Sequence, residues 1–123
     1  MAVILISEDE KDIRELIAFT LRFAGYEIIS TTNGEEAYQI ALEMLPDLVL
    51  LDVRMPRMSG YEVCKKLKKN ETTRDIPVVF ISAKGQVNEI EEGISAGAEE
   101  YILKPFSPDQ LTKSINAILD NSK

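Results

Sequence analysis

Five short apolar segments alternate with longer amphipathic segments along the chain, and this alternation restricts the fold more than any other feature. The apolar segments are residues 3–6, 26–30, 48–51, 78–81 and 101–103, each with the length and composition of a β-strand. An amphipathic segment with helical spacing follows each of them. A strand–helix unit repeated in this way predicts an α/β fold, in which helices cover both faces of a parallel sheet.

Turn and capping residues mark where the predicted helices begin and end. Gly25 and Gly97 are placed to end two of them. Asn33 is suited to cap the second helix, and Ser59 and Ser107 each begin a capping box. The helical side chains expected to face the sheet are Ile13, Leu16, Ile17, Leu21, Ala24, Ala37, Ile40, Ala41, Met44, Val63, Cys64, Leu67, Val87, Ile90, Ile94, Leu111, Ile115, Ile118 and Leu119.

The expected arrangement is one domain, residues 1–123, built on a doubly wound sheet. Right-handed crossovers leave few ways to connect parallel strands, and we expect the flavodoxin-like strand order 2-1-3-4-5. In that order the direction of winding changes between the first and third strands. Ligands of such sheets bind beyond the carboxyl ends of the strands at this switch point.

Composition limits the partners and the compartment of the protein. The net charge of −7 argues against direct binding to nucleic acid or to an anionic membrane. The single cysteine, Cys64, cannot form an internal disulfide, which favours a reducing compartment. The first apolar segment is too short for a signal peptide, and no segment is long enough to span a bilayer. We therefore expect a cytoplasmic protein.

The chain contains no histidine. This excludes Ser-His-Asp hydrolysis, Cys-His proteolysis, histidine-ligated zinc and a role as a phosphohistidine carrier. Any chemistry must rest on carboxylates, hydroxyls and amines, or on a metal held by oxygen ligands.

Five polar residues are predicted to gather at the switch point. Glu8 and Asp9 follow the first strand, Asp52 ends the third, Ser82 follows the fourth and Lys104 follows the fifth. Taken singly, each has an ordinary explanation, such as a helix cap, a loop hydroxyl or a solvated amine. Together, three crowded carboxylates repel one another unless a cation lies between them. Oxygen ligands without histidine or cysteine favour Mg²⁺, or Mn²⁺ in its place.

Four sequence motifs make the chain resemble a response-regulator receiver domain from end to end. They are ILISEDE at 4–10, LLDVRMPRMSG at 50–60, FISA at 80–83 and YILKPF at 101–106. The resemblance implies that Asp52 accepts a phosphoryl group from the phosphohistidine of a sensor histidine kinase or a histidine phosphotransfer protein. It also implies that Glu8 and Asp9 form an acidic pair, and that Asp9, Asp52 and the backbone carbonyl of Arg54 bind the metal ion.

The resemblance further implies a conformational switch. Ser82 matches the switch hydroxyl, Lys104 the lysine that contacts the phosphoryl oxygens, and Tyr101 the aromatic switch residue. The Lys104–Pro105 peptide is a candidate cis bond. The readout surface would be the predicted helix 87–96, strand 101–103 and the last helix, which would control a target protein or a self-dimer.

Two further hypotheses concern charged side chains. Arg54 and Lys84 lie two residues after Asp52 and Ser82, where receiver domains tune the lifetime of the phosphoryl group. We expect these long basic side chains to slow the approach of water. The second hypothesis is that an acidic group selects a basic partner surface; its members are Glu89, Glu91, Glu92, Glu99 and Glu100.

Other functions compete with a phosphorylatable switch that modifies only itself. A phosphohydrolase of the haloacid-dehalogenase type needs a second Asp where this chain has Arg54. A flavodoxin-like cofactor binder needs a phosphate-binding loop, but the acidic segment 7–10 would repel phosphate. A purely structural receiver would not need the full set of acids, hydroxyl and lysine. The chain could be a shuttle or a receiver cut from a longer transcriptional or enzymatic regulator. Ser114 and Asn121 stand where transcription-factor receivers carry arginines, which weakens the dimer interpretation.

Overall fold

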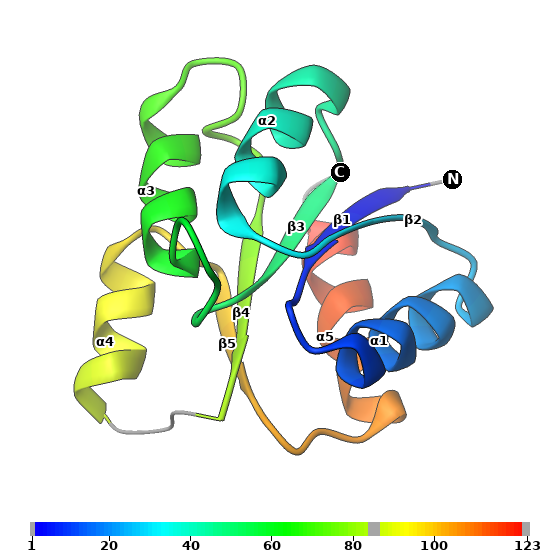
Figure 1. Ribbon diagram of the computed structural model, residues 1–123. Coiled ribbons are helices and arrows are strands. Elements are labelled where there is room, and N and C mark those ends of the chain that lie inside the picture. Colours follow the sequence, from blue (N-terminus) through cyan, green and yellow to red (C-terminus); the bar gives the residue numbers. More distant parts are fainter. Residues whose placement is uncertain (1, 84–86, 122–123) are drawn as a thin grey trace.

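The computed structural model describes residues 2–83 and 87–121, which form five strands and five helices in strict alternation (Figure 1). The strands are β1 (Val3–Ser7), β2 (Glu27–Thr31), β3 (Leu48–Asp52), β4 (Val78–Ser82) and β5 (Glu100–Leu103). The helices are α1 (Lys11–Phe23), α2 (Gly34–Met44), α3 (Gly60–Lys69), α4 (Val87–Ser95) and α5 (Pro108–Asn121).

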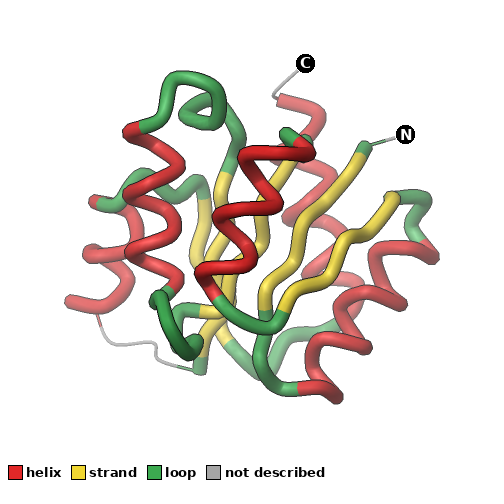
Figure 2. Tube along the Cα trace, turned by 45° about the horizontal axis from the view of Figure 1, so that its top comes forward, coloured by secondary structure: helices red, strands yellow, loops and turns green. Residues whose placement is uncertain are grey.

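The sheet is entirely parallel and has the order β2-β1-β3-β4-β5, which confirms the predicted topology. Helices α1 and α5 cover one face, and α2, α3 and α4 cover the other (Figures 1 and 2). All residues of β3 and β4 are buried. Because helices cover both faces of these strands, their apolar runs are continuous rather than alternating.

The sheet separates two apolar cores. On one side, Ile17 and Leu21 of α1 and Leu111 and Ile115 of α5 pack against the sheet. On the other side, residues of α2 and α3 pack against the strand residues that point to that face. This second core includes Leu5, Ala37, Ala41, Val49, Leu51, Val63, Cys64, Leu67 and Phe80. This double coverage holds the strand ends, and the side chains that follow them, in fixed positions.

Most helical side chains predicted to face the sheet are buried or partly buried, but the prediction was wrong for Leu16, Ala24, Met44 and Ile94, which are exposed. Ala24 follows the last turn of α1, and Met44 is the last residue of α2. On α4 it is Gly93 that lies against the sheet: a Cβ placed there would come within 2.9 Å of the Phe80 ring. Leu16 lies at the outer edge of α1, facing a groove shared with α5. The Val87 side chain lies outside the described residues.

The predicted caps are present. The Asn33 side chain accepts a hydrogen bond from the Glu36 N–H at 2.8 Å, and the Ser107 hydroxyl accepts one from the Gln110 N–H at 3.0 Å. Gly25 has a φ of 101° and Gly97 a φ of 108°, in the left-handed region where a glycine follows a helix end without strain. These local signals fix the short connections around the sheet.

Candidate functional site

The polar residues predicted to gather do lie at the carboxyl edge of the sheet. Glu8 and Asp9 follow β1, Asp52 ends β3, Ser82 ends β4 and Lys104 follows β5. Because β1, β3, β4 and β5 are parallel neighbours, their last residues meet at one edge. The topology therefore gathers groups that are far apart in the sequence.

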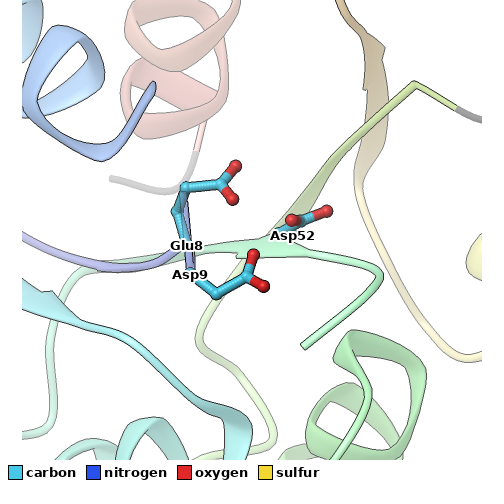
Figure 3. A group of neighbouring side chains, drawn as sticks. All are labelled: Glu8, Asp9 and Asp52. Atoms are coloured by element: carbon cyan, nitrogen blue, oxygen red, sulfur yellow. The ribbon is translucent and has the colours of Figure 1, made fainter. Parts of the chain in front are cut away.

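Three carboxylates form the centre of this site. Glu8, Asp9 and Asp52 each offer one oxygen, and these oxygens lie within 4.8 Å of one another. Figure 3 shows the carboxylates of Glu8 and Asp9 directed toward the side on which Asp52 lies. Glu8 and Asp52 are buried, with 1% and 7% of their surfaces exposed, whereas Asp9 is exposed to solvent. The three carboxylates are thus accessible to solvent at Asp9 and enclosed by protein at Glu8 and Asp52.

Lys104 neutralises part of this charge. Its Nζ lies 2.8 Å from Glu8 Oε1 and 3.6 Å from Asp52 Oδ2. Burial acts to lower the pKa of Lys104, but the hydrogen bond to Glu8 and the charge of Asp52 outweigh it and raise the pKa above its ordinary value. The lysine is therefore held in its charged form between two acids.

The carboxyl group of Glu8 is strongly perturbed by its surroundings. Burial raises its pKa from 4.5 to about 7; the hydrogen bond with Asp52 acts in the same direction, and the bond with Lys104 acts against it. One lysine against three acids leaves an excess of negative charge in a partly enclosed site. A hard divalent cation fits this site, because all the ligands offered are carboxylate oxygens.

The backbone around Asp52 also belongs to the site. The Arg54 N–H donates to Asp52 Oδ1 at 3.3 Å, and the Lys104 N–H donates to the carbonyl of Ser82 at 2.9 Å. Ser82 is buried. The Lys104–Pro105 peptide bond, a candidate cis bond from the family resemblance, is cis. Lys84, predicted to act with Arg54 on phosphoryl lifetime, lies outside the described residues.

Tyr101 lies on β5, and its ring contacts Phe80 edge to face with 6.0 Å between centroids. Tyr61, which was not predicted from the sequence, extends this aromatic group. Its ring contacts Phe80 at 5.1 Å, and its hydroxyl donates to the Glu89 carbonyl at 2.9 Å. An aromatic residue in the first turn of an amphipathic helix gives no sequence signal for such a contact.

The fold and the site together define a class: a doubly wound parallel sheet with an acid cluster and a lysine at its switch point. Comparison with known families makes the assignment specific. The profile of the response regulator receiver domain matches residues 4–116. The chain belongs to this family.

Two transcriptional regulators illustrate its relatives. The phosphate regulon transcriptional regulatory protein PhoB of Pseudomonas aeruginosa is 43% identical over 116 residues, covering 94% of this chain and 51% of PhoB. The DNA-binding dual master transcriptional regulator RpaA of Synechocystis sp. is 34% identical over 119 residues, covering 97% of this chain and 49% of RpaA. The chain thus spans about half the length of these relatives.

Solved structures agree with the fold and the family. The chemotaxis response regulator CheY4 of Vibrio cholerae superimposes with a TM-score of 0.91 at 30% identity, covering 96% of this chain and 98% of that one. The receiver domain of a signal transduction histidine kinase from Syntrophus aciditrophicus gives a TM-score of 0.93 at 31% identity, covering 100% of this chain and 93% of that one.

Membership of this family indicates a general role in two-component signalling. Receiver domains belong to the response regulators of two-component signalling, work with histidine kinases and generally bind Mg²⁺. They are signalling domains rather than enzymes in general. Among the described residues, no helix has both the length and the apolar character needed to cross a membrane.

Proposed function

We propose that this chain is a phosphorylatable switch in which Asp52 accepts a phosphoryl group from the phosphohistidine of a sensor histidine kinase or a histidine phosphotransfer protein. One observation supports this most directly. The buried Asp52 carboxylate lies beside two further acids and 3.6 Å from the Lys104 ammonium, at the edge where such sheets bind ligands. An acid in these surroundings can be approached by a phosphoryl group once positive charge offsets the repulsion.

Glu8, Asp9, Asp52 and the Arg54 backbone carbonyl would hold Mg²⁺, or Mn²⁺. The bound ion supplies positive charge to the phosphoryl oxygens during transfer. The acids of this chain provide the hard oxygen ligands that such an ion requires. Asp9, the exposed member of the group, would be the first ligand that an entering ion meets.

Asp52 would act as the nucleophile. One carboxylate oxygen forms a bond to phosphorus while the bond between phosphorus and the donor's imidazole nitrogen breaks, and the imidazole keeps that electron pair. The product is an acyl phosphate on Asp52. Lys104 would contact a phosphoryl oxygen as a point charge. Its present partner, Glu8, lies 2.8 Å away, so the lysine would be shared between Glu8 and the new phosphoryl group.

The Ser82 hydroxyl and the Tyr101 ring would convert this modification into a change of shape. A hydroxyl at the end of β4 can donate to a phosphoryl oxygen only when one is present. Such a contact exists in one state alone and can shift an equilibrium between two conformations. Tyr101 would move into the space that Ser82 leaves, and the surface formed by α4, β5 and α5 would change for a downstream target or a self-dimer.

The proposal includes a single receiver domain over residues 1–123, a cytoplasmic location and no direct contact with nucleic acid or membrane. A second candidate is favoured by the coverage of the relatives. Since the chain matches 51% of PhoB and 49% of RpaA, it can be the receiver part of a longer transcriptional regulator, with the output supplied by another domain.

The test uses acetyl phosphate as a small phosphoryl donor, with intact-protein mass spectrometry as the readout. We expect the wild-type chain to gain one phosphoryl group when Mg²⁺ is present and none when the metal is chelated. Asp52→Asn should gain none. Asp75→Asn, at an exposed acid just before β4, is the matched control and should behave as wild type. A phosphoryl group on Asp52→Asn, or none on the wild type, would refute the proposal.

A further inference from the structure

Gly34, the first residue of α2, lies against the backbone of the segment that follows Asp52. A Cβ added at Gly34 would lie 2.0 Å from the Met58 carbonyl oxygen and 2.8 Å from the Met58 carbonyl carbon. Because both are backbone atoms, rotation of a side chain cannot relieve the overlap. Only glycine allows α2 and this segment to approach so closely.

The segment in question is residues 53–59, which we call the Asp52 loop, and it is tied at both ends. The Gly60 N–H donates to the Val53 carbonyl at 2.9 Å, and the Val53 N–H donates to the Ile81 carbonyl at 3.3 Å. A Cβ at Gly60 would lie 2.4 Å from the Asp52 carbonyl oxygen. Because the loop is short and hydrogen-bonded at both ends, we expect a displacement at Met58 to reach the residues next to Asp52.

A second contact joins the same corner of the molecule to the Asp52 loop. The Ser7 hydroxyl lies 3.2 Å from the Asn33 carbonyl oxygen and 2.9 Å from the Met55 sulfur. With one proton it donates to one of these acceptors at a time. Ser7 ends β1 directly before Glu8. The corner formed by Asn33 and Gly34, which we call the α2 corner, therefore meets the loop directly at Met58, and the Ser7 hydroxyl lies between this corner and Met55.

We propose that Gly34 is a positioning residue for the metal site. By letting the Asp52 loop pack against the α2 corner, it sets the depth at which the Asp52 carboxylate and the Arg54 backbone face Glu8 and Asp9. The inference rests on the proposed function, in which these groups share a divalent ion. In this inference Gly34 acts on the ligands through Met58.

Titration calorimetry with MgCl₂ on the unphosphorylated protein tests this directly. We expect Gly34→Ala to weaken Mg²⁺ affinity about tenfold, the lower end of the effect of losing support around metal ligands. Alanine has a higher helix propensity than glycine, so a weakened helix would not explain such a loss. The matched control is Ala41→Gly, at a buried position two turns further along α2, which disturbs the helix without adding atoms near the loop. It should change Mg²⁺ affinity less than about twofold.

Thermal unfolding with and without Mg²⁺ separates binding from stability. In Gly34→Ala the increase in Tm produced by Mg²⁺ should shrink, whereas in Ala41→Gly the Tm should fall equally in both conditions. Should Gly34→Ala fail to fold, Ser7→Ala takes its place as the test variant, because it removes the second contact and adds no volume. We expect Ser7→Ala to bind Mg²⁺ more weakly than wild type.

Wild-type Mg²⁺ affinity in Gly34→Ala, or in Ser7→Ala where the first variant is unfolded, would overturn the inference. Asp9→Asn distinguishes this failure from failure of the proposed function. If the wild type binds Mg²⁺ and Asp9→Asn does not, the metal site stands and only the role of Gly34 is lost. If the wild type binds no Mg²⁺ at all, the proposed metal site is itself wrong.

Discussion

At the scale of single residues, the ion pair between Lys104 and Glu8 places a positive charge beside the Asp52 carboxylate. The ammonium lies closer to Glu8 than to Asp52, at 2.8 Å against 3.6 Å. The ion pair with Glu8 keeps the lysine beside Asp52, although the lysine is farther from Asp52 than from Glu8. In the proposed function, phosphoryl transfer to Asp52 would require little movement of the lysine, because the Lys104 ammonium already lies 3.6 Å from an Asp52 carboxylate oxygen.

The raised pKa of Glu8 makes stability depend on pH. Between its unfolded pKa of 4.5 and its folded pKa of about 7, the folded protein holds a proton that the unfolded chain has released. This contribution is therefore complete below about pH 4.5 and is lost as pH rises through about 7. In metal-free buffer we expect the free energy of unfolding to fall by on the order of 2 kcal/mol across this range.

Urea denaturation at several pH values, in the presence of a chelator, measures this effect. Glu8→Gln, which cannot ionise, should show a flatter profile over the same range. A wild-type profile as flat as that of Glu8→Gln would show that Glu8 is ionised throughout and that its burial has little energetic effect.

Cys64 gives a second prediction at this scale. Burial raises the pKa of its thiol to about 11, and the Sγ donates to the Ala96 carbonyl at 3.3 Å. Since the thiolate is the reactive form, a thiol reagent at about pH 8 should label the folded protein very slowly. Labelling should become fast in urea. Rapid stoichiometric labelling of the folded protein would contradict the buried position.

At the scale of elements, Tyr61 ties α3 to the first turn of α4. Burial raises the pKa of its hydroxyl, with a hydrogen bond to Tyr101 acting in the same direction, and this hydroxyl donates to the Glu89 carbonyl. Tyr61→Phe keeps the ring against Phe80 but removes the hydroxyl, and with it the bonds to the Glu89 carbonyl and to Tyr101, which should cost about 1 kcal/mol of stability. We expect faster amide hydrogen exchange in α4, measured by mass spectrometry.

Tyr38→Phe is the matched control for this substitution. Tyr38 lies on α2 with its ring below the Lys66 ammonium, 5.5 Å from the ring centroid. Removal of its hydroxyl should leave exchange in α4 unchanged. Equal exchange in Tyr61→Phe and wild type would mean that packing alone holds the start of α4.

The elements were largely predictable from the sequence, and the exceptions have physical causes. Strands β3 and β4 extend one residue beyond their apolar runs, to Asp52 and Ser82, because backbone pairing continues after the hydrophobic side chains end. On α4, periodicity favoured Ile94, but the rings of Phe80 and Tyr101 lie so close to the helix that Gly93 occupies the inward position. Periodicity measures the hydrophobicity of a helix and not the shape of what it packs against.

The site was predictable to a similar extent. Strand ends and motifs located Glu8, Asp9, Asp52 and Lys104, because parallel strands bring their carboxyl ends to one edge. The pairing of Lys104 with Glu8 and the contact of Gly34 with Met58 were not predictable. Both depend on how closely segments distant in sequence approach, which neither spacing nor composition reports.

At the scale of the whole molecule, Mg²⁺ should act as a stabilising ligand. An ion that binds only the folded state raises stability as its concentration exceeds Kd, by about 3 kcal/mol at a hundredfold excess. We expect Mg²⁺ to raise Tm by several degrees in thermal unfolding followed by circular dichroism. Asp9→Asn should abolish most of this shift. NaCl at matched ionic strength controls for screening, and an equal shift in NaCl would point to a non-specific salt effect.

All of the site lies at one edge of the sheet, and the loop between α3 and β4 lies at the opposite edge. In that loop Glu71 and Thr72 are exposed, while Thr73 is buried and its hydroxyl donates to the Leu67 carbonyl at 2.7 Å. A reporter sequence inserted between Glu71 and Thr72 would therefore leave the carboxyl edge untouched. The fold thus offers a fusion point for a biosensor that would follow the proposed phosphorylation of Asp52 from outside the site.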